Sequence, residues 1–86
     1  MPRALTIQRT IVPAQERKRY MDRARERKAY YERARCSFWV FEEAALPGAF
    51  IEFTEAPNRA ALSAAHAAAP ESLVDPARIY LEVELS

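Results

Sequence analysis

The chain has very little cysteine, histidine or glycine, with one residue of each among its 86. A single Cys excludes an internal disulfide, and one Cys with one His cannot supply an ordinary zinc site. The sequence has no glycine-rich phosphate loop and no serine-nucleophile motif, so nucleotide-binding and hydrolase functions have no support. No secretory or transit pattern opens the chain, and no apolar run is long enough to cross a bilayer. We therefore expect a cytoplasmic protein without membrane contact.

Bulky apolar residues are scarce as well. Half of the residues are hydrophobic, but 17 of these are Ala. A chain of this length buries only about 60% of its unfolded surface, so small domains usually gain stability from disulfides, a metal or a partner subunit. Because the first two are excluded, residues 1–86 are expected to form one small domain that associates with another subunit.

The net charge of +1 hides a strong segregation of charge along the chain. Residues 14–35 hold nine bases and four acids, whereas residues 36–86 hold two bases and eight acids. Within the basic segment, acids and bases recur at the spacing of helical ion pairs: Glu16 with Arg19, Asp22 with Arg25, and Lys28 with Glu32. This pattern is typical of a solvated helix, so we do not expect nucleic-acid binding.

Hydrophobic periodicity and breaker residues predict six elements. Residues 4–12 alternate as a strand, and residues 14–35 form a long helix without Gly or Pro. Strands at residues 36–43 and 49–55 flank a turn, a second helix runs over residues 58–69 until Pro70, and a last strand covers residues 78–85. The order β-α-β-β-α-β is that of the ferredoxin-like split βαβ fold in the α+β class. It predicts a four-stranded antiparallel sheet with both helices on one face.

Strand parity predicts which residues share a face of this sheet. One parity is apolar except for Arg9 and is expected beneath the helices: Leu5, Ile7, Ile11, Cys36, Phe38, Val40, Ala49, Ile51, Phe53, Ile79, Leu81, Val83 and Leu85. The other parity places Trp39, Phe41, Phe50 and Tyr80 among polar residues that include Glu52. Four aromatic side chains are too much apolar surface to leave in water, so these five residues are predicted to form a dimer interface.

Two other partners for this second face remain open. Exposed sheet aromatics can stack on RNA bases, but Glu52, Glu82 and Glu84 would bring negative charge to phosphate. A different protein chain or a small molecule could also cover the aromatic residues. The homodimer, packed sheet to sheet, is the partner that also compensates for the small core.

The order of elements, together with residues 49–66 (AFIEFTEAPNRAALSAAH), resembles the dimeric α+β barrel proteins, especially the antibiotic-biosynthesis-monooxygenase-like group. The resemblance implies a homodimer whose sheets form a barrel, with a ligand cleft between the sheet and helices of each subunit. That superfamily includes cofactor-independent monooxygenases, haem-degrading enzymes and isomerases. This chain departs from the family in its shortness, in its basic first helix and in carrying Trp39 on the second strand.

His66 is the candidate catalytic residue, because it is the only side chain expected to titrate near neutrality without perturbation. It could serve as a haem ligand or a proton carrier in the cleft, or it could be packed against a backbone carbonyl. The predicted cleft also contains two cations, Arg9 and Arg27, that could hold an anionic ligand. Alternatively, Arg27 extends along Tyr20 and Tyr31, and Arg9 pairs with a helix carboxylate. Either cation needs a partner if it is buried.

Three aromatic residues, Tyr20, Tyr31 and Phe53, complete the predicted cleft. They could line a site for a small aromatic or anionic ligand, or simply pack the core. Cys36 is interpreted as a core residue, since a helix C-terminus and burial both oppose a reactive thiolate. No metal site and no cofactor are expected, apart from a haem that His66 could bind. Two functions follow: a monooxygenase-like or haem-handling enzyme, and a non-catalytic small-molecule-binding or assembly module.

Overall fold

The computed structural model describes residues 2–69 and 78–85. Its elements, in chain order, are β1 (Ala4–Ile11), the 3-10 turn η1 (Ala14–Glu16), α1 (Arg17–Arg33), β2 (Ser37–Glu42), β3 (Ala49–Ala56), α2 (Arg59–Ala67) and β4 (Tyr80–Leu81). All strand pairs are antiparallel and the sheet order is β2-β3-β1-β4. The predicted α+β class, with four antiparallel strands and two helices, is confirmed, and this arrangement is compatible with a ferredoxin-like fold.

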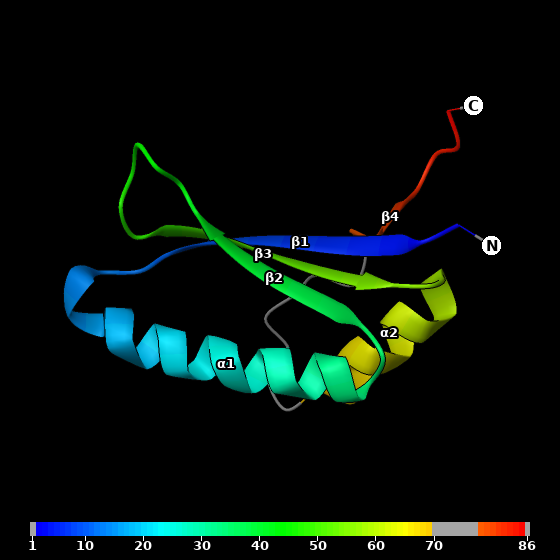
Figure 1. Cartoon of the computed structure of the whole chain (residues 1–86), viewed down its shortest axis with the longest axis horizontal. Coiled ribbons are helices and arrows are strands. Elements are labelled where there is room, and N and C mark those ends of the chain that lie inside the picture. The colour runs from blue at the N-terminus through cyan, green and yellow to red at the C-terminus, as the bar shows by residue number, and fades with distance from the viewer. Residues whose placement is uncertain (1, 70–77, 86) are drawn as a thin grey trace.

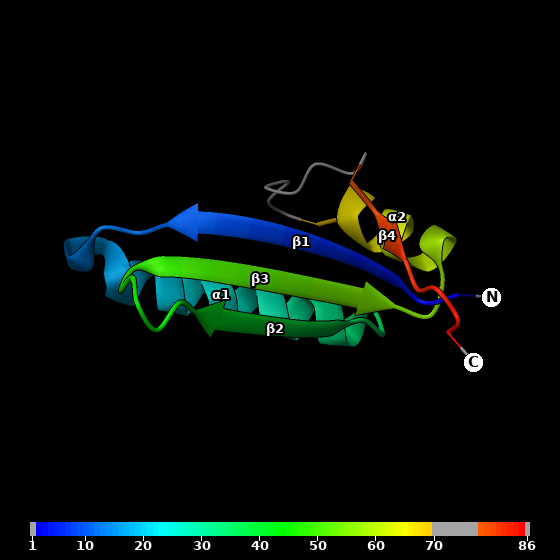
Figure 2. The same ribbon diagram turned by 90° about the horizontal axis from the view of Figure 1, so that it is seen from above.

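Both helices lie on the same side of the sheet (Figure 1). α1 runs beneath β2 and β3, and α2 lies near β1 and β4 (Figure 2). The hydroxyl of Tyr30 on α1 donates to the backbone oxygen of Ala65 on α2 at 2.7 Å, which ties the two helices together. No helix of the described residues covers the second sheet face, and we call it the open face.

The long helix begins and ends close to its predicted limits. Pro13 terminates β1, and residues 14–16, predicted as part of the helix, form a 3-10 turn that leads into α1. At the other end Arg35 has a φ of 65°, the left-handed conformation that commonly follows a helix. The second helix is capped by Asn58, whose side chain accepts from the Ala61 backbone N–H. Pro70, its predicted terminator, and the loop over residues 71–77 lie outside the described residues.

The last strand is shorter than predicted: β4 comprises Tyr80–Leu81 rather than residues 78–85. The reason lies in its partner. Leu81 pairs with Ala4 at the start of β1, and the Glu82 backbone N–H donates to the Arg3 carbonyl at 2.9 Å. The next residue would face Pro2, which has no N–H to donate. The chain therefore continues beyond the sheet without a strand partner.

The predicted face assignment is wrong for β1 and β3. Thr6, Glu52 and Thr54 are buried beneath the helices, and Ile7 and Phe53 lie on the open face. The cross-strand pairs show the same division, because Phe38 is opposite Thr54 and Trp39 is opposite Phe53. The alternation of one strand shows which of its residues share a face. It does not show which of these two sets lies on the same side of the sheet as a given set of the neighbouring strand. The turn at residues 43–48 sets that register.

Residues from both helices and three strands meet in one core cluster. Its members are Ala4, Tyr31, Cys36, Phe38, Ala56, Leu62 and Ala65. Tyr31 stacks on Phe38 with ring centroids 5.7 Å apart, and Leu62 is fully buried. As the sequence predicts, this core is small and rich in alanine. It lies on the helix side of the sheet and does not include the open face.

Candidate functional site

A buried ion pair occupies the layer between α1 and the sheet. The Arg27 guanidinium donates twice to the Glu52 carboxylate, from Nε to Oε1 at 3.1 Å and from Nη2 to Oε2 at 2.6 Å. Tyr20 donates its hydroxyl to the same Oε2 at 2.6 Å, and burial raises the pKa of this phenol. The two charged side chains are only 11% and 7% exposed. Three donors therefore satisfy a carboxylate that would otherwise be very unfavourable in the interior.

His66 is the centre of a second buried polar group. Its Nε2 lies 2.8 Å from the Thr6 hydroxyl and its Nδ1 lies 2.8 Å from the Tyr31 hydroxyl. Burial lowers the pKa of His66 and raises that of Tyr31 to about 12, so both side chains are neutral near neutral pH. A neutral imidazole donates from one nitrogen and accepts at the other, and a hydroxyl can serve either role. Both ring nitrogens are thus occupied.

This geometry does not fit a haem at His66. An axial ligand needs one ring nitrogen with its lone pair directed at the iron. Here both nitrogens are within hydrogen-bond distance of buried hydroxyls, and the residue is 8% exposed. The described residues also contain no group of three or more His, Cys, Asp or Glu side chains placed to hold a metal ion. Cys36 is buried, and burial raises the pKa of its thiol.

A cavity of about 310 Å³ opens beside the Arg27–Glu52 pair, at the end of the sheet where β1 turns into α1. Tyr20, Arg27 and Glu52 form one wall, and Arg19 and Arg23 also line it. The three arginines outnumber the two acids that line the cavity, Glu52 and Glu16. This cavity lies between α1 and the sheet, where the sequence predicts a cleft.

The predicted cleft residues do not all reach this layer. Tyr20, Arg27 and Tyr31 lie in it, but Arg9 and Phe53 project from the open face, so their assignment to the cleft is wrong. Arg9 approaches Glu43 in the turn at 3.5 Å and does not pair with a helix carboxylate. Arg27 has the partner that its burial requires, Glu52, and its guanidinium lies 5.6 Å from the ring centroid of Tyr20, one of the two tyrosines along which the alternative extends it.

The predicted dimer interface is also divided between the two faces. Trp39, Phe41 and Tyr80 lie on the open face and are 44%, 57% and 53% exposed. Phe50 and Glu52 are buried under α1, where Phe50 stacks on Tyr20 at 4.5 Å, so their assignment to this interface is wrong. On β3, the open face instead carries Ile51 and Phe53, which the sequence assigns to the apolar face beneath the helices. The open face comprises Leu5, Ile7, Arg9, Ile11, Ser37, Trp39, Phe41, Ile51, Phe53, Glu55 and Tyr80.

Sequence reasoning missed Thr6 and Glu52 as interior polar partners. A signal for Glu52 was available, because an arginine on the inner side of a helix needs a buried carboxylate and Glu52 lies in the middle of the strand predicted over residues 49–55. No comparable signal identifies Thr6, since its role depends on where α2 places His66.

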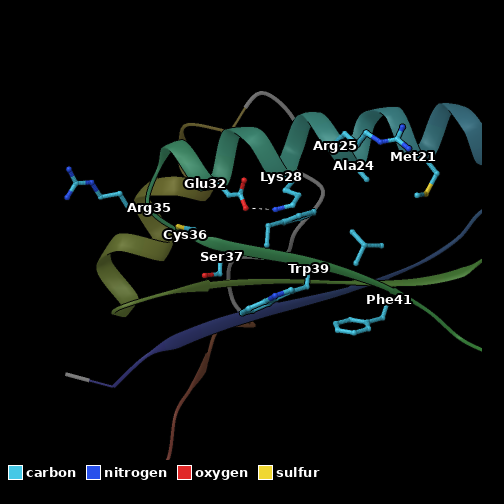
Figure 3. Close-up of a pocket in the computed structure, with 12 residues that line it drawn as sticks. Met21, Ala24, Arg25, Lys28, Glu32, Arg35, Cys36, Ser37, Trp39 and Phe41 are labelled. Carbon is cyan, nitrogen blue, oxygen red and sulfur yellow. Dashed lines mark hydrogen bonds and ion pairs between the residues drawn. The ribbon is translucent and has the colours of Figure 1, made fainter.

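A groove of about 820 Å³ follows the outer edge of β2, between that strand and α1 (Figure 3). Its lining combines apolar side chains, which include Met21, Ala24, Phe38 and Val40, with four charged ones, Arg25, Lys28, Glu32 and Arg35. Trp39 and Phe41 also line the groove, although they project from the side of β2 that faces away from α1. None of the lining residues belongs to the Arg27–Glu52 pair or to the polar group around His66.

Within the described part of the chain, no helix combines the length and apolar character needed to cross a bilayer. Searches with protein-family models, against curated proteins and against solved structures found no match to this chain.

Proposed function

We propose that this chain is a non-catalytic assembly module that forms a homodimer by packing the open faces of two copies against each other. The observation that carries the proposal is the apolar character of the open face. One cross-strand row consists of Ile7, Phe53 and Trp39, and the next places Ile51 beside Phe41. Contiguous apolar surface of this kind marks an interaction site in soluble proteins.

The distribution of polar groups supports the same proposal. Thr6 of β1 and Glu52 of β3 lie beneath the helices, where Thr6 bonds His66 and Glu52 bonds Tyr20 and Arg27. The apolar residues of the same strands are therefore left on the other side. A second copy brings an identical apolar face, so two-fold packing would remove both from water. This arrangement is the one that the resemblance to dimeric α+β barrels implies.

The occupied His66 nitrogens weigh against the haem-handling role. The monooxygenase-like role needs an enclosed cleft, and the space near Tyr31 is filled by its own ring, Phe38 and His66. We therefore favour the assembly module over an enzyme.

Light scattering and sedimentation at micromolar concentration test the proposal. The unaltered chain should be a dimer, and Phe41→Glu or Trp39→Glu should yield a folded monomer, because each places a charge in the apolar contact. Leu46→Glu is the matched control, since Leu46 is 45% exposed in the turn beside the sheet and should leave the dimer intact. A monomeric unaltered chain, or open-face variants that remain dimeric, would contradict the proposal.

A second candidate is binding of a small anionic ligand in the 310 Å³ cavity. The observation that favours it is the excess of arginines at a site already walled by a buried ion pair. Isothermal titration with phosphate and with benzoate tests it. Loss of binding in the Arg19→Glu variant would support this candidate. A heat of binding that is the same in Arg19→Glu and in the unaltered chain would exclude it.

A further inference from the structure

The open face carries one charge of each sign, on the two central strands of the sheet. β3 and β1 are the second and third strands in the sheet order, and they present Glu55 and Arg9 on this face. The other residues that define the open face are uncharged. Two copies packed face to face would remove both charged side chains from water, and a charge removed from water needs a partner.

The two charges lie symmetrically about the middle of the face. The cross-strand pair of Ile7 and Phe53 marks that middle. Arg9 is two residues beyond Ile7 along β1, and Glu55 is two residues beyond Phe53 along β3. Because the two strands are antiparallel, these displacements have opposite directions, and each is about 7 Å long. The open face therefore has a positive end and a negative end at equal distances from one central pair.

Both charged groups keep bonding capacity that their own chain does not use. Arg9 reaches Glu43 through one nitrogen at 3.5 Å, and both side chains are more than half exposed. Glu55 accepts from Arg3 at one oxygen, and Arg3 donates two further bonds to Glu82. A guanidinium has five N–H donors, and each carboxylate oxygen can accept more than one bond. Exposed ion pairs of this kind contribute little stability, so both groups can bond a further partner.

The two-fold axis of a face-to-face dimer lies between the sheets and can run in either of two directions. If it runs along the strands, Arg9 of one copy lies near Arg9 of the other, and Glu55 lies near Glu55. If it runs across the strands through the Ile7–Phe53 pair, Arg9 of each copy lies near Glu55 of the other. Stacked sheets are about 10 Å apart, a distance that an arginine and a glutamate side chain can span together. Only the second direction brings opposite charges together.

We infer that Arg9 of each copy pairs with Glu55 of the other, and that these two reciprocal ion pairs select the two-fold axis that crosses the strands. This inference rests on the proposed homodimer and deepens it, because it names the residues that fix the orientation of the second copy. The apolar rows supply the contact area, and the two charges supply orientation and choice of partner. The inference also gives a role to the one charge on the open side of β1.

Charge reversal in separate chains tests the pairing. Arg9→Glu and Glu55→Arg should each raise the homodimer dissociation constant by about tenfold or more, because each homodimer then contains two contacts between like charges. An equimolar mixture of the two variants should form a heterodimer, because both contacts are again between opposite charges. Its dissociation constant should be within about threefold of that of the unaltered homodimer. Sedimentation of the mixture with one variant labelled with fluorescein measures this constant. A mixture as weak as the separate variants would overturn the inference.

Two control variants separate contact between copies from effects within one chain. Arg9→Lys keeps the positive charge, and Glu43→Gln removes the contact of Arg9 within its own chain. Both should leave the dissociation constant within about threefold of the unaltered value. If Glu43→Gln weakens the dimer as much as Arg9→Glu does, Arg9 acts through the turn and the inference is wrong. Thermal unfolding of every variant checks that it is folded.

Association of Arg9→Glu with the unaltered chain distinguishes the two axes. It should be weaker than association of the unaltered chain with itself, because one of the two contacts is then between like charges. Tighter association would mean that Arg9 lies near Arg9 and would overturn the inference. A dimer that Phe41→Glu disrupts but both charge reversals leave intact would retain the proposed function and reject the ion pairs. A monomeric unaltered chain would overturn both.

Discussion

Arg27 on α1 and Glu52 on β3 face each other across the interior and are joined by two hydrogen bonds, of 3.1 and 2.6 Å. A buried ion pair contributes little net stability compared with apolar residues of the same size, but loss of one partner leaves an uncompensated charge. The pair therefore acts mainly as a constraint on register. It requires the polar parity of β3 to lie under α1, and this turns Ile51 and Phe53 outward.

Removal of one member of this pair should destabilise the fold strongly. Arg27→Met is expected to lower the free energy of unfolding by roughly 3–5 kcal/mol, because Glu52 stays buried without its main partner. Urea unfolding measures the change. Arg25→Met is the control: Arg25 bonds Asp22 at 3.0 Å on the helix surface, and its loss should change stability by less than about 1 kcal/mol. Arg27→Met with Glu52→Leu should recover much of the loss, and no recovery would contradict this account.

His66 should make the stability depend on pH. Burial lowers the pKa of His66 in the folded chain below its ordinary 6.5. The unfolded chain thus binds a proton at a higher pH than the folded chain. The stability that neutral His66 contributes is fully present above about pH 6.5. As pH falls from there toward the pKa of His66 in the folded chain, the free energy of unfolding decreases by up to about 1.4 kcal/mol per pH unit.

Thermal unfolding between about pH 7 and 5 measures this loss. Because His66 is the only histidine, His66→Gln should flatten the curve over this window. A slope that persists in His66→Gln would assign the titration to another group.

Gly48 should not tolerate a side chain. Its φ is 94°, and a Cβ atom would lie 2.6 Å from the backbone oxygen of Val12, whose own N–H donates to the Gly48 carbonyl at 2.8 Å. Gly48→Ala is expected to cost roughly 1–3 kcal/mol in chemical unfolding. Gly48→Asn should do no better, because its Cβ meets the same oxygen. Ala44→Ser in the same turn should be nearly neutral, and an equal loss there would show that the turn as a whole is sensitive.

Asn58 should contribute to α2 through its cap. Its side-chain oxygen accepts from the Ala61 N–H at 2.8 Å, so Asn58→Ala should destabilise by about 1 kcal/mol, measured by urea unfolding. Asn58→Ser should retain most of the stability, because a hydroxyl can also cap. Equal losses in the two variants would indicate that the cap bond does not explain the effect.

The order and approximate limits of the elements were predictable, because they depend on local patterns. Alternation and breakers located β1, β2 and β3 within about two residues, and the Gly- and Pro-free run located α1. The limit of β4 was not predictable from its own alternation. It depends on where β1 begins and on Pro2, which lie nearly the whole chain away.

The candidate site was predictable only in part. Helical spacing correctly put Tyr20, Arg27 and Tyr31 on the inner side of α1, since that side follows from the period of one helix. It could not show that Arg27 meets Glu52 or that His66 meets Thr6, because those partners come from separate elements.

The sequence by itself determined that two sheet faces exist, that both contain aromatic or apolar residues, and that Trp39 and Phe41 share a face. These properties follow from the two-residue period of a strand. Only the tertiary structure decided which face of β1 and β3 the helices cover. That choice depends on the register set by the turn at residues 43–48 and on the polar groups that the helices bring inward. Glu52 and Thr6 can lie beneath the helices because Tyr20, Arg27 and His66 supply the partners that buried polar groups need, and Ile7, Ile51 and Phe53 of the same strands then face the open side.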